Sequence, residues 1–341
     1  MAVEVQTRTY PKIDLTPSLN FLFFCKYLSL IRITLSSVSK QKIKPRTAKP
    51  MIYQEMLPCV ALRPYVNCFW MIHSVNPLST QDRTFPDGCQ EICFNIDTTV
   101  LRDDGKGFAA NPAVELIGQM TRPYDIVTQG KNLHFGVKFY PHSFSRFTKE
   151  SIYDLRDRSI DLRDLMGPQF LDIIDKVFEK PTFARFIECM ECFFLNVLSL
   201  KNPNEKAYAM VSHAVQTLMR MKNHTKIEFL ADLVGIGERS LQNMFKHHVG
   251  LGPKLLIKMI RFQRTFPYLK NHRYSLTDIA HLCGYYDQAH FTHEFKTFTG
   301  VYPSKFRATD YPLNQFFLDE NSYAYLCNYR ELSDMENTQF I

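Results

Sequence analysis

Glycine and tryptophan are scarce in this chain of 341 residues, which contains 13 glycines, 18 prolines and one tryptophan. So little glycine and proline excludes a collagen-like or low-complexity chain, and a hydrophobic content of 45% is typical of folded protein. The length is enough for two domains of ordinary size. We therefore expect a two-domain globular protein.

A regular cysteine spacing is also missing. The nine cysteines are scattered along the chain, and their number is odd. Such a set does not form a disulfide framework, and we interpret it as the reduced thiols of a cytoplasmic protein.

No long uncharged apolar run is present. The most apolar stretch, residues 18–35, is interrupted by Lys26 and Arg32, so its uncharged part is too short to span a bilayer. Asp14 and the lack of a small-residue cleavage site argue against a signal peptide. We expect no membrane partner, and we interpret residues 1–50 as a disordered extension or as sequence upstream of a true start at Met51. Membrane attachment is the alternative.

Charge is divided unevenly along the chain. Residues 201–310 contain sixteen Lys or Arg against eight Asp or Glu, and also eight of the eleven histidines. Residues 51–200 contain fifteen Lys or Arg against nineteen Asp or Glu. A basic folded segment beside an acidic one indicates that only the basic segment contacts a polyanion.

Residues 52–140 have the pattern of β-structure. Apolar and polar or small residues alternate around residues 92–96 and again over residues 133–139, where His134, Gly136 and Lys138 fall on the polar face. Period-two alternation is typical of half-buried strands, and turn residues such as those at 86–88 separate them. We expect a β-barrel or a sandwich.

The period becomes helical after residue 141. We expect helices at residues 157–166, 169–178 and 182–198, followed by a linker at 201–204. The third helix is apolar enough to form a dimer contact, and packing on the strands is the alternative interpretation.

Residues 205–307 contain a helix-turn-helix pattern twice. In the first copy, Thr225 is the expected cap of a helix that ends at Gly235, and a second helix covers residues 238–248. In the second copy, Ser275 caps a helix that ends at Gly284, and the next helix covers residues 287–298. Four residues recur fifty positions later: Leu241, Phe245, Gly250 and Pro253 correspond to Phe291, Phe295, Gly300 and Pro303.

A helix over residues 253–270 is expected to join the two copies. Pro267 lies inside it and should kink it, because proline has no N–H to donate. Two units joined in this way can reach two successive major-groove faces of one DNA duplex.

The outward faces of the two recognition helices contain residues that suit DNA. Arg can bind guanine, and Gln and Asn can bind adenine, while lysines one turn further on suit phosphates. The expected base contacts are Arg239, Gln242, Asn243, Gln288, His290 and His293, and the expected phosphate contacts are Lys246 and Lys296. A merely solvated helix face is the alternative.

The residues from Ser275 to Phe306, which include Cys283-Gly-Tyr-Tyr-Asp-Gln-Ala-His-Phe291 and Phe298-Thr-Gly-Val-Tyr-Pro-Ser-Lys-Phe306, resemble the second half of an AraC-type (AraC/XylS) DNA-binding domain. Residues 261–264 resemble the linker helix of that family, and residues 238–253 resemble its first half more loosely. The resemblance implies a sequence-specific transcription regulator, with activation as the expected direction. Double-stranded DNA and RNA polymerase are the implied partners.

The front of the chain resembles the cupin-like domain that often precedes such regulators. Phe85-Pro-Asp-Gly-Cys89 and Phe135-Gly-Val-Lys-Phe-Tyr-Pro141 carry this resemblance, which implies no particular ligand. The predicted fold is a two-domain α+β protein with a cupin-like N-terminal β-barrel and an all-α tandem helix-turn-helix domain. The predicted parts are an extension (1–50), a sensor or dimerisation domain (51–200), a DNA-binding domain (201–310) and a tail (311–341).

Ligand contacts in the front domain could come from the polar strand face (Asn95, His134 and Lys138) or from the turn at residues 86–89. An ordinary surface is the alternative, and the single tryptophan, Trp70, is expected in the core. A small-molecule effector and a homodimer are therefore open possibilities.

We predict no enzyme activity, no cofactor and no catalytic or metal site. The front domain has only His73, His134 and His142, without the clustered spacing of a metal-binding cupin. The alternative class is a DNA alkylation-repair protein, in which a cysteine–zinc centre accepts alkyl groups. Its four thiols would be Cys89, Cys93, Cys189 and Cys192. A third class is an interaction protein whose helix-turn-helix units are only structural.

Overall fold

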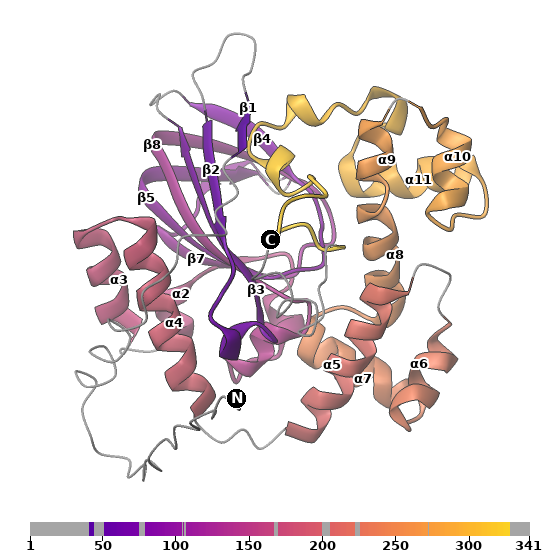
Figure 1. Ribbon diagram of the computed structural model, residues 1–341, viewed down its shortest axis with the longest axis horizontal. Coiled ribbons are helices and arrows are strands. Elements are labelled where there is room, and N and C mark those ends of the chain that lie inside the picture. Colours follow the sequence, from indigo (N-terminus) through magenta and orange to yellow (C-terminus); the bar gives the residue numbers. More distant parts are fainter. Residues whose placement is uncertain are drawn as a thin grey trace, which may run out of the picture. The chain divides into compact units, whose positions relative to one another are not determined.

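A nine-stranded antiparallel sheet forms the front half in the computed structural model of the protein (Figure 1). The strand order is β1-β2-β3-β8-β5-β7-β9, with β4 on β8 and β6 on β5. In the described part of the chain this is an open path, so closure into a barrel is not detected, although the β fold is confirmed. The strands are β1 (Gln41–Ile43), β2 (Met51–Met56), β3 (Val66–Ser74), β4 (Thr80–Thr84), β5 (Glu91–Asp103), β6 (Phe108–Ala110), β7 (Val114–Ile117), β8 (Tyr124–Phe139) and β9 (Ser159–Asp161).

The structure describes residues 41–43, 51–74, 79–103, 105, 107–166, 170–199, 205–221, 226–271 and 273–327. The expected cap at Thr225, the expected linker at 201–204 and most of the N-terminal extension lie outside these residues. Residues 37–341 form one unit by their internal contacts.

One face of the sheet is covered by helices. Phe94, Phe135 and Phe139 pack there against α3 and α4, as the alternation of these strands predicted (Figure 1). The apolar residues of α4 are buried in this core, which supports the packing interpretation of the third predicted helix. The helices on this side are α2 (Leu162–Met166), α3 (Leu171–Glu179) and α4 (Phe183–Ser199).

The helix expected at residues 157–166 is wrong in its first half. Asp157 has a φ of +56°, which is outside the helical region, and its carboxylate accepts hydrogen bonds from the Thr121 backbone (2.7 Å) and hydroxyl (2.8 Å). The chain then forms β9, which pairs with β7, so that only α2 remains helical.

The other face of the sheet is covered by the C-terminal residues 311–327, which we call the strap (Figure 1). Phe316 stacks on Tyr53 with 4.5 Å between ring centroids. Two buried carboxylates hold the strap: Asp82 accepts from the Leu313 backbone N–H, and Glu55 accepts from the Tyr323 N–H (2.7 Å). The described part of the tail is therefore a structural element of the front half.

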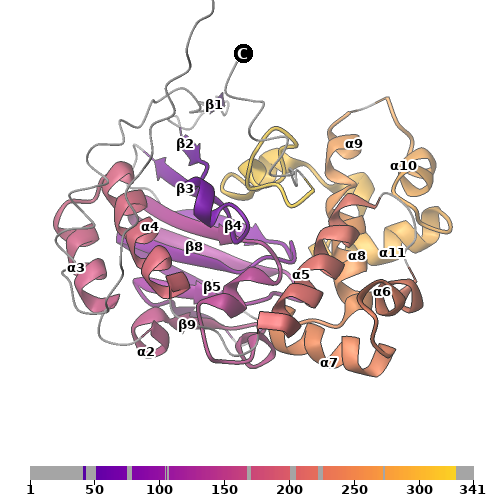
Figure 2. The ribbon, with the colours of Figure 1, turned by 60° about the horizontal axis from the view of Figure 1, so that its bottom comes forward.

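The rear half is helical, as predicted. Figure 2 shows its helices on the side of the sheet opposite to α3 and α4. Its core contains Phe245, Phe262, Phe291 and Phe295, and it also takes in Phe85 from the front half. The helices are α5 (Glu205–Arg220), α6 (Ile227–Val234), α7 (Glu238–Val249), α8 (Pro253–Gln263), α9 (Phe266–Lys270), α10 (Leu276–Leu282) and α11 (Gln288–Thr299).

The helix expected over residues 253–270 is two helices. α8 ends at Gln263, and α9 begins at Phe266 with Pro267 in its first turn. Proline cannot donate to the carbonyl four residues earlier, which is that of Gln263. The Tyr325 hydroxyl of the strap donates to this carbonyl instead (2.8 Å), and the Gln263 side chain donates to the Pro86 carbonyl (2.9 Å). The break thus joins the rear half to both the strap and the front half.

His248 joins α7 to the front half. The Ser145 hydroxyl, on the short helix η2 (Ser143–Arg146), donates to the His142 carbonyl (2.8 Å). Its oxygen therefore accepts from His248 Nδ1, which lies 3.0 Å away. Burial, and then the nearby charge of His247, lower the pKa of His248 to about 4.

We predict that acid weakens this junction through His248. The unfolded histidine takes up a proton near pH 6.5, whereas the folded one resists protonation down to about pH 4, so stability falls as the pH drops through this window. Between pH 7.5 and pH 5 the unfolding free energy of the native chain should fall. In His248→Asn this fall should be smaller by about 1–2 kcal/mol. Denaturant unfolding of the full chain at the two pH values measures this loss.

The control is His213→Asn, which changes an exposed histidine on α5. The control should keep the pH dependence of the native chain. Equal pH dependence of His248→Asn and the native chain would refute the assignment.

Candidate nucleic-acid interface and internal cavity

The first helix-turn-helix unit consists of α6, a turn and α7. Gly235 ends α6 in the left-handed conformation (φ +70°), which non-glycine residues adopt at a cost. Leu230, Leu241 and Phe245 pack inward, so the residues between them on α7 face outward. Four predicted contacts are exposed on this face: Arg239, Gln242, Asn243 and Lys246.

The second unit consists of α10 and α11, and Ser275 caps α10 as predicted. Ser275 and Asp278 form a reciprocal capping box at the start of α10. Asp287 caps α11 by accepting from the His290 backbone N–H (2.7 Å). Phe291 and Phe295 are buried, which turns the opposite face of α11 outward.

The predicted contacts on α11 differ in how much they are already engaged. Gln288 and His293 are exposed, and the Gln288 side-chain oxygen accepts from the Thr277 hydroxyl (2.8 Å). Lys296 is exposed and lies over the Tyr302 ring, donating to its hydroxyl (3.0 Å). These residues, and those on α7, remain predictions as DNA contacts.

His290 is less available than the sequence indicated. Its side chain is 38% exposed, and its Nε2 lies 3.5 Å from Arg261 Nη2 and 3.7 Å from a Glu294 carboxylate oxygen. Its Nδ1 accepts from the Tyr286 backbone N–H (3.4 Å). The ring is therefore partly held inside the protein, and its role as a base contact is the weakest of the six.

Sequence reasoning missed an ion pair that holds α11 in place. Arg261 on α8 donates twice to the Glu294 carboxylate (2.6 and 3.1 Å), and both side chains are largely buried. The Arg261 guanidinium also lies over the Tyr285 ring (4.3 Å). Such a bidentate pair fixes orientation, so the second recognition helix is tied to the linker helix. The spacing of charged residues within α11 does not indicate that Glu294 pairs with Arg261 on another helix.

The front half touches equivalent positions of the two units. Gly250 and Gly300, which end α7 and α11, both have a φ near +80°. A Cβ at Gly250 would lie 2.9 Å from the carbonyl oxygen of Ile152 in η3 (Ile152–Leu155), and a Cβ at Gly300 would lie 2.8 Å from Arg83 Nη1. Neither site can accept a larger residue without a shift, so the front half packs closely on the end of each recognition helix.

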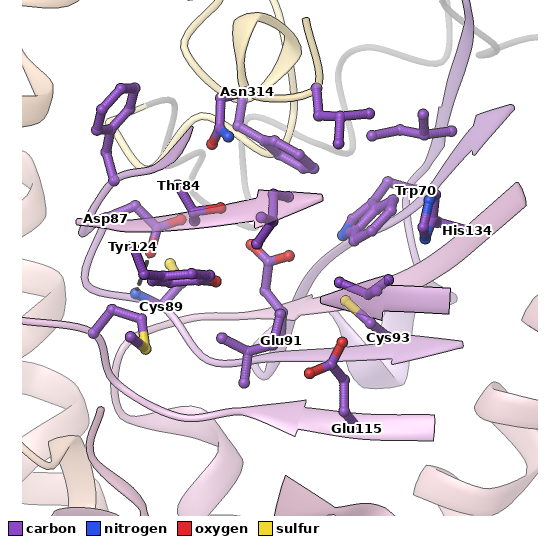
Figure 3. Close-up of a pocket in the computed structure, with 18 of the residues that line it drawn as sticks. Trp70, Thr84, Asp87, Cys89, Glu91, Cys93, Glu115, Tyr124, His134 and Asn314 are labelled. Atoms are coloured by element: carbon purple, nitrogen blue, oxygen red, sulfur yellow. Dashed lines mark hydrogen bonds between the residues drawn. The ribbon is translucent and has the colours of Figure 1, made fainter. Parts of the chain in front are cut away.

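An internal cavity of about 120 Å³ lies between the sheet, the strap and α8 (Figure 3). Trp70, Glu91 and His134 line it from the sheet, Gln263 from α8 and Phe317 from the strap. The predicted ligand residues Asn95 and His134 and the turn residues Asp87 and Cys89 also line it. They are not the ordinary surface that was the alternative, because the strap covers the polar face of β8.

Lys138 is not among the residues that line the cavity, although its ammonium nitrogen lies 5.0 Å from the centre of the Phe317 ring, which does line it. Lys138 is buried between the carboxylates of Asp87 and Glu91, with Glu91 at 2.7 Å. Burial alone would lower the pKa of Lys138, but the two carboxylates outweigh burial and raise it. Lys138 is therefore an internal counter-ion.

The four cysteines of the alkyl-transfer alternative are not gathered in one place. Cys89 lies in the core of the rear half, Cys93 lies under the strap, and Cys189 and Cys192 are buried on α4. Burial raises the pKa of Cys89 and Cys93 well above the usual range, which makes them poor nucleophiles. Among the described residues, no group of three or more metal-ligating side chains is close enough to hold a metal ion.

None of the described helices is both long and apolar enough to cross a bilayer.

Two families match separate parts of the chain. Residues 54–161 match a domain of unknown function (DUF6597), and residues 230–309 match a helix-turn-helix domain. An uncharacterised HTH-type transcriptional regulator of Haemophilus influenzae is 30% identical over 93 residues, which are 27% of this chain and 31% of that protein. The HTH-type transcriptional activator RhaS of an Enterobacter species is 33% identical over 69 residues, or 20% of this chain and 25% of RhaS.

The matched region is thus about a quarter to a third of these curated relatives. Among solved structures, a Chromobacterium violaceum transcriptional regulator, described as AraC-type DNA-binding domain-containing, covers 31% of this chain and 96% of its own, with 22% identity and a TM-score of 0.29. Residues 230–309 are thus similar to the helix-turn-helix domain of HTH-type transcriptional regulators, and they follow a region that matches DUF6597.

Proposed function

We propose that the protein is a sequence-specific DNA-binding transcription regulator of the cytoplasm, with activation as its expected direction. The observation that carries this proposal is the pair of helix-turn-helix units with exposed polar recognition faces. α7 presents Arg239, Gln242 and Asn243, and α11 presents Gln288 and His293. Side chains of these kinds read base edges in the major groove, and the basic charge of residues 201–310 suits a phosphate backbone.

The front half supplies the regulation in this proposal. It packs on the ends of both recognition helices through Ile152 and Arg83, and its cavity has one wall from the linker helix α8 and another from the strap. A small molecule in the cavity would therefore contact the element that sets the relative placement of the two units. Homodimerisation and contact with RNA polymerase belong to the same proposal as predictions.

The test is binding of the full chain to DNA. Sites selected from random duplexes should share a sequence, and affinity should fall steeply with salt because phosphate contacts release counterions. Equal affinity for all duplexes would contradict the regulator and favour a protein whose helix-turn-helix units are only structural.

Two substitutions should separate base contacts from phosphate contacts. Arg239→Ala should cost about 1–3 kcal/mol on the selected site and relax the preference at one base position. Lys296→Ala should weaken binding to all duplexes alike and reduce the salt dependence. Arg122→Ala, an exposed change in the front half, is the control. Identical behaviour of the first two variants would show that the two kinds of contact have been assigned wrongly.

The break between α8 and α9 gives a further prediction. Pro267→Ala restores an N–H that can donate to the Gln263 carbonyl, so the two helices can join and the units change their relative placement. We expect an altered footprint and weaker binding to the selected site. Tyr325→Phe, which removes only the hydroxyl bound to that carbonyl, is the matched variant. An unchanged footprint and affinity in Pro267→Ala would show that the break has no role in DNA recognition.

A further inference from the structure

The cavity contains a buried hydrogen-bond acceptor that lacks a donor. The Asn95 side-chain nitrogen donates to the Pro112 carbonyl (3.2 Å) and to the Glu115 carboxylate (3.0 Å), so the Asn95 oxygen faces His134 Nδ1 at 2.8 Å. Nδ1 must then carry the hydrogen, which leaves Nε2 as an acceptor. In the described part of the chain Nε2 has no partner, although His134 is only 6% exposed. Such an atom is costly unless a ligand supplies an N–H or O–H.

His134 stays neutral at physiological pH. Burial lowers its pKa to about 4, so the acceptor on Nε2 is present throughout the neutral range. A second wall atom, the hydroxyl oxygen of Thr128, is also buried and has no partner within the described ranges. Two residues of β8 therefore present polar atoms to the cavity that lack a hydrogen-bond partner.

The cavity is surrounded by more negative than positive charge. Asp87, Glu91 and Glu115 line it, whereas no Lys or Arg does so among the described residues. Lys138 pairs with the first two carboxylates, and Arg102 acts on Glu115 at longer range. Burial raises the pKa of Glu91 and of Glu115, because their ionised forms are costly in this site. A carboxylate ligand would add a further negative charge, whereas an ammonium group would favour the ionised form of Glu115.

The remaining wall is apolar and the space is small. Trp70, Ile72, Phe85 and Phe317 contribute apolar surface, and Figure 3 shows Glu91 and Glu115 rising from the strands into the space beside Trp70. The volume of about 120 Å³ is close to the roughly 150 Å³ of a protein cavity that holds one benzene ring. The ligand therefore has the size of a single ring with a short substituent.

We propose that the cavity under the strap binds a small apolar amine, whose ammonium group donates to His134 Nε2 and is balanced by Glu115. Asn95 bonds to both residues, which places the acceptor and the carboxylate at the same end of the cavity. The ring lies against Trp70 and Phe317, so the bound amine contacts the strap. This inference rests on the proposed function only in that the amine would be the effector of the regulator.

Three probes with one skeleton and different charge test the proposal. Calorimetric titration of the full chain would compare phenethylamine, 2-phenylethanol and phenylacetate. We expect the amine to bind about tenfold more tightly than the alcohol, and the carboxylate to bind most weakly, because charge interactions are strong in a buried site. Equal affinity of amine and alcohol, tightest binding of the carboxylate, or binding of none of the three would overturn the proposal.

Substitutions assign the two roles within the site. Glu115→Gln should abolish the preference for the amine over the alcohol, while His134→Phe should weaken both probes several-fold. Glu150→Gln is the matched control, because it makes the same change at an exposed position. Thermal unfolding without ligand checks that each variant folds. If a folded Glu115→Gln variant still prefers the amine over the alcohol, Glu115 does not balance the ammonium group and the assignment is overturned.

DNA binding distinguishes this inference from the proposed function. A chain that binds selected DNA sites but none of the probes would refute the amine and leave the regulator intact. A chain that binds phenethylamine but shows no sequence preference for DNA would refute the regulator and leave the amine site intact, since the calorimetric result does not depend on DNA.

Discussion

The carbonyl of Gln263 is the point on which the arrangement of the halves depends. Pro267 leaves this carbonyl without its helical donor, and Tyr325 of the strap supplies one (2.8 Å), while the Gln263 side chain binds the Pro86 carbonyl (2.9 Å). A buried carbonyl without a donor would cost free energy, so the strap stabilises the break that Pro267 imposes on the linker helix. One residue thus joins the sheet, the linker between the two units and the C-terminal residues.

The contacts at Gly250 and Gly300 extend this constraint to the recognition helices. The front half approaches the end of α7 through a backbone carbonyl and the end of α11 through Arg83, which is itself paired with Asp125 (2.6 Å). A guanidinium at a helix C-terminus is favourable, because the last carbonyls carry partial negative charge. Both units are therefore in contact with the front half, the first through η3 and the second through β4.

Local signals in the sequence were enough for most elements. The capping box at Ser275, the left-handed Gly235 and the alternation of β5 and β8 act over a few residues, so the sequence contains all the information that they need. The long-range contacts left no such signal. Asp82 binds a strap residue that lies 231 positions later, and Glu55 binds a strap residue that lies 268 positions later. In the sequence, an isolated carboxylate in a strand is typical of an exposed position. The open strand path depends on pairing between distant segments, which the alternation within single strands does not determine. The linker helix breaks just before Pro267, the residue that was expected to kink it.

The polar face of β8 shows what alternation can and cannot determine. The pattern of His134, Gly136 and Lys138 establishes that this face differs from the apolar one, but water is only one of the environments that polar residues accept. Here the strap covers the face, Lys138 is neutralised by Asp87 and Glu91, and a Cβ at Gly136 would lie 2.0 Å from the Trp70 ring. Among the described residues of β8 that line the cavity, His134 Nε2 and the Thr128 hydroxyl remain without a partner. A face that is covered by the strap and yet keeps unpartnered polar atoms beside a cavity supports the proposed binding site, because an ordinary core would have lost the polar groups and an ordinary surface would not have been covered.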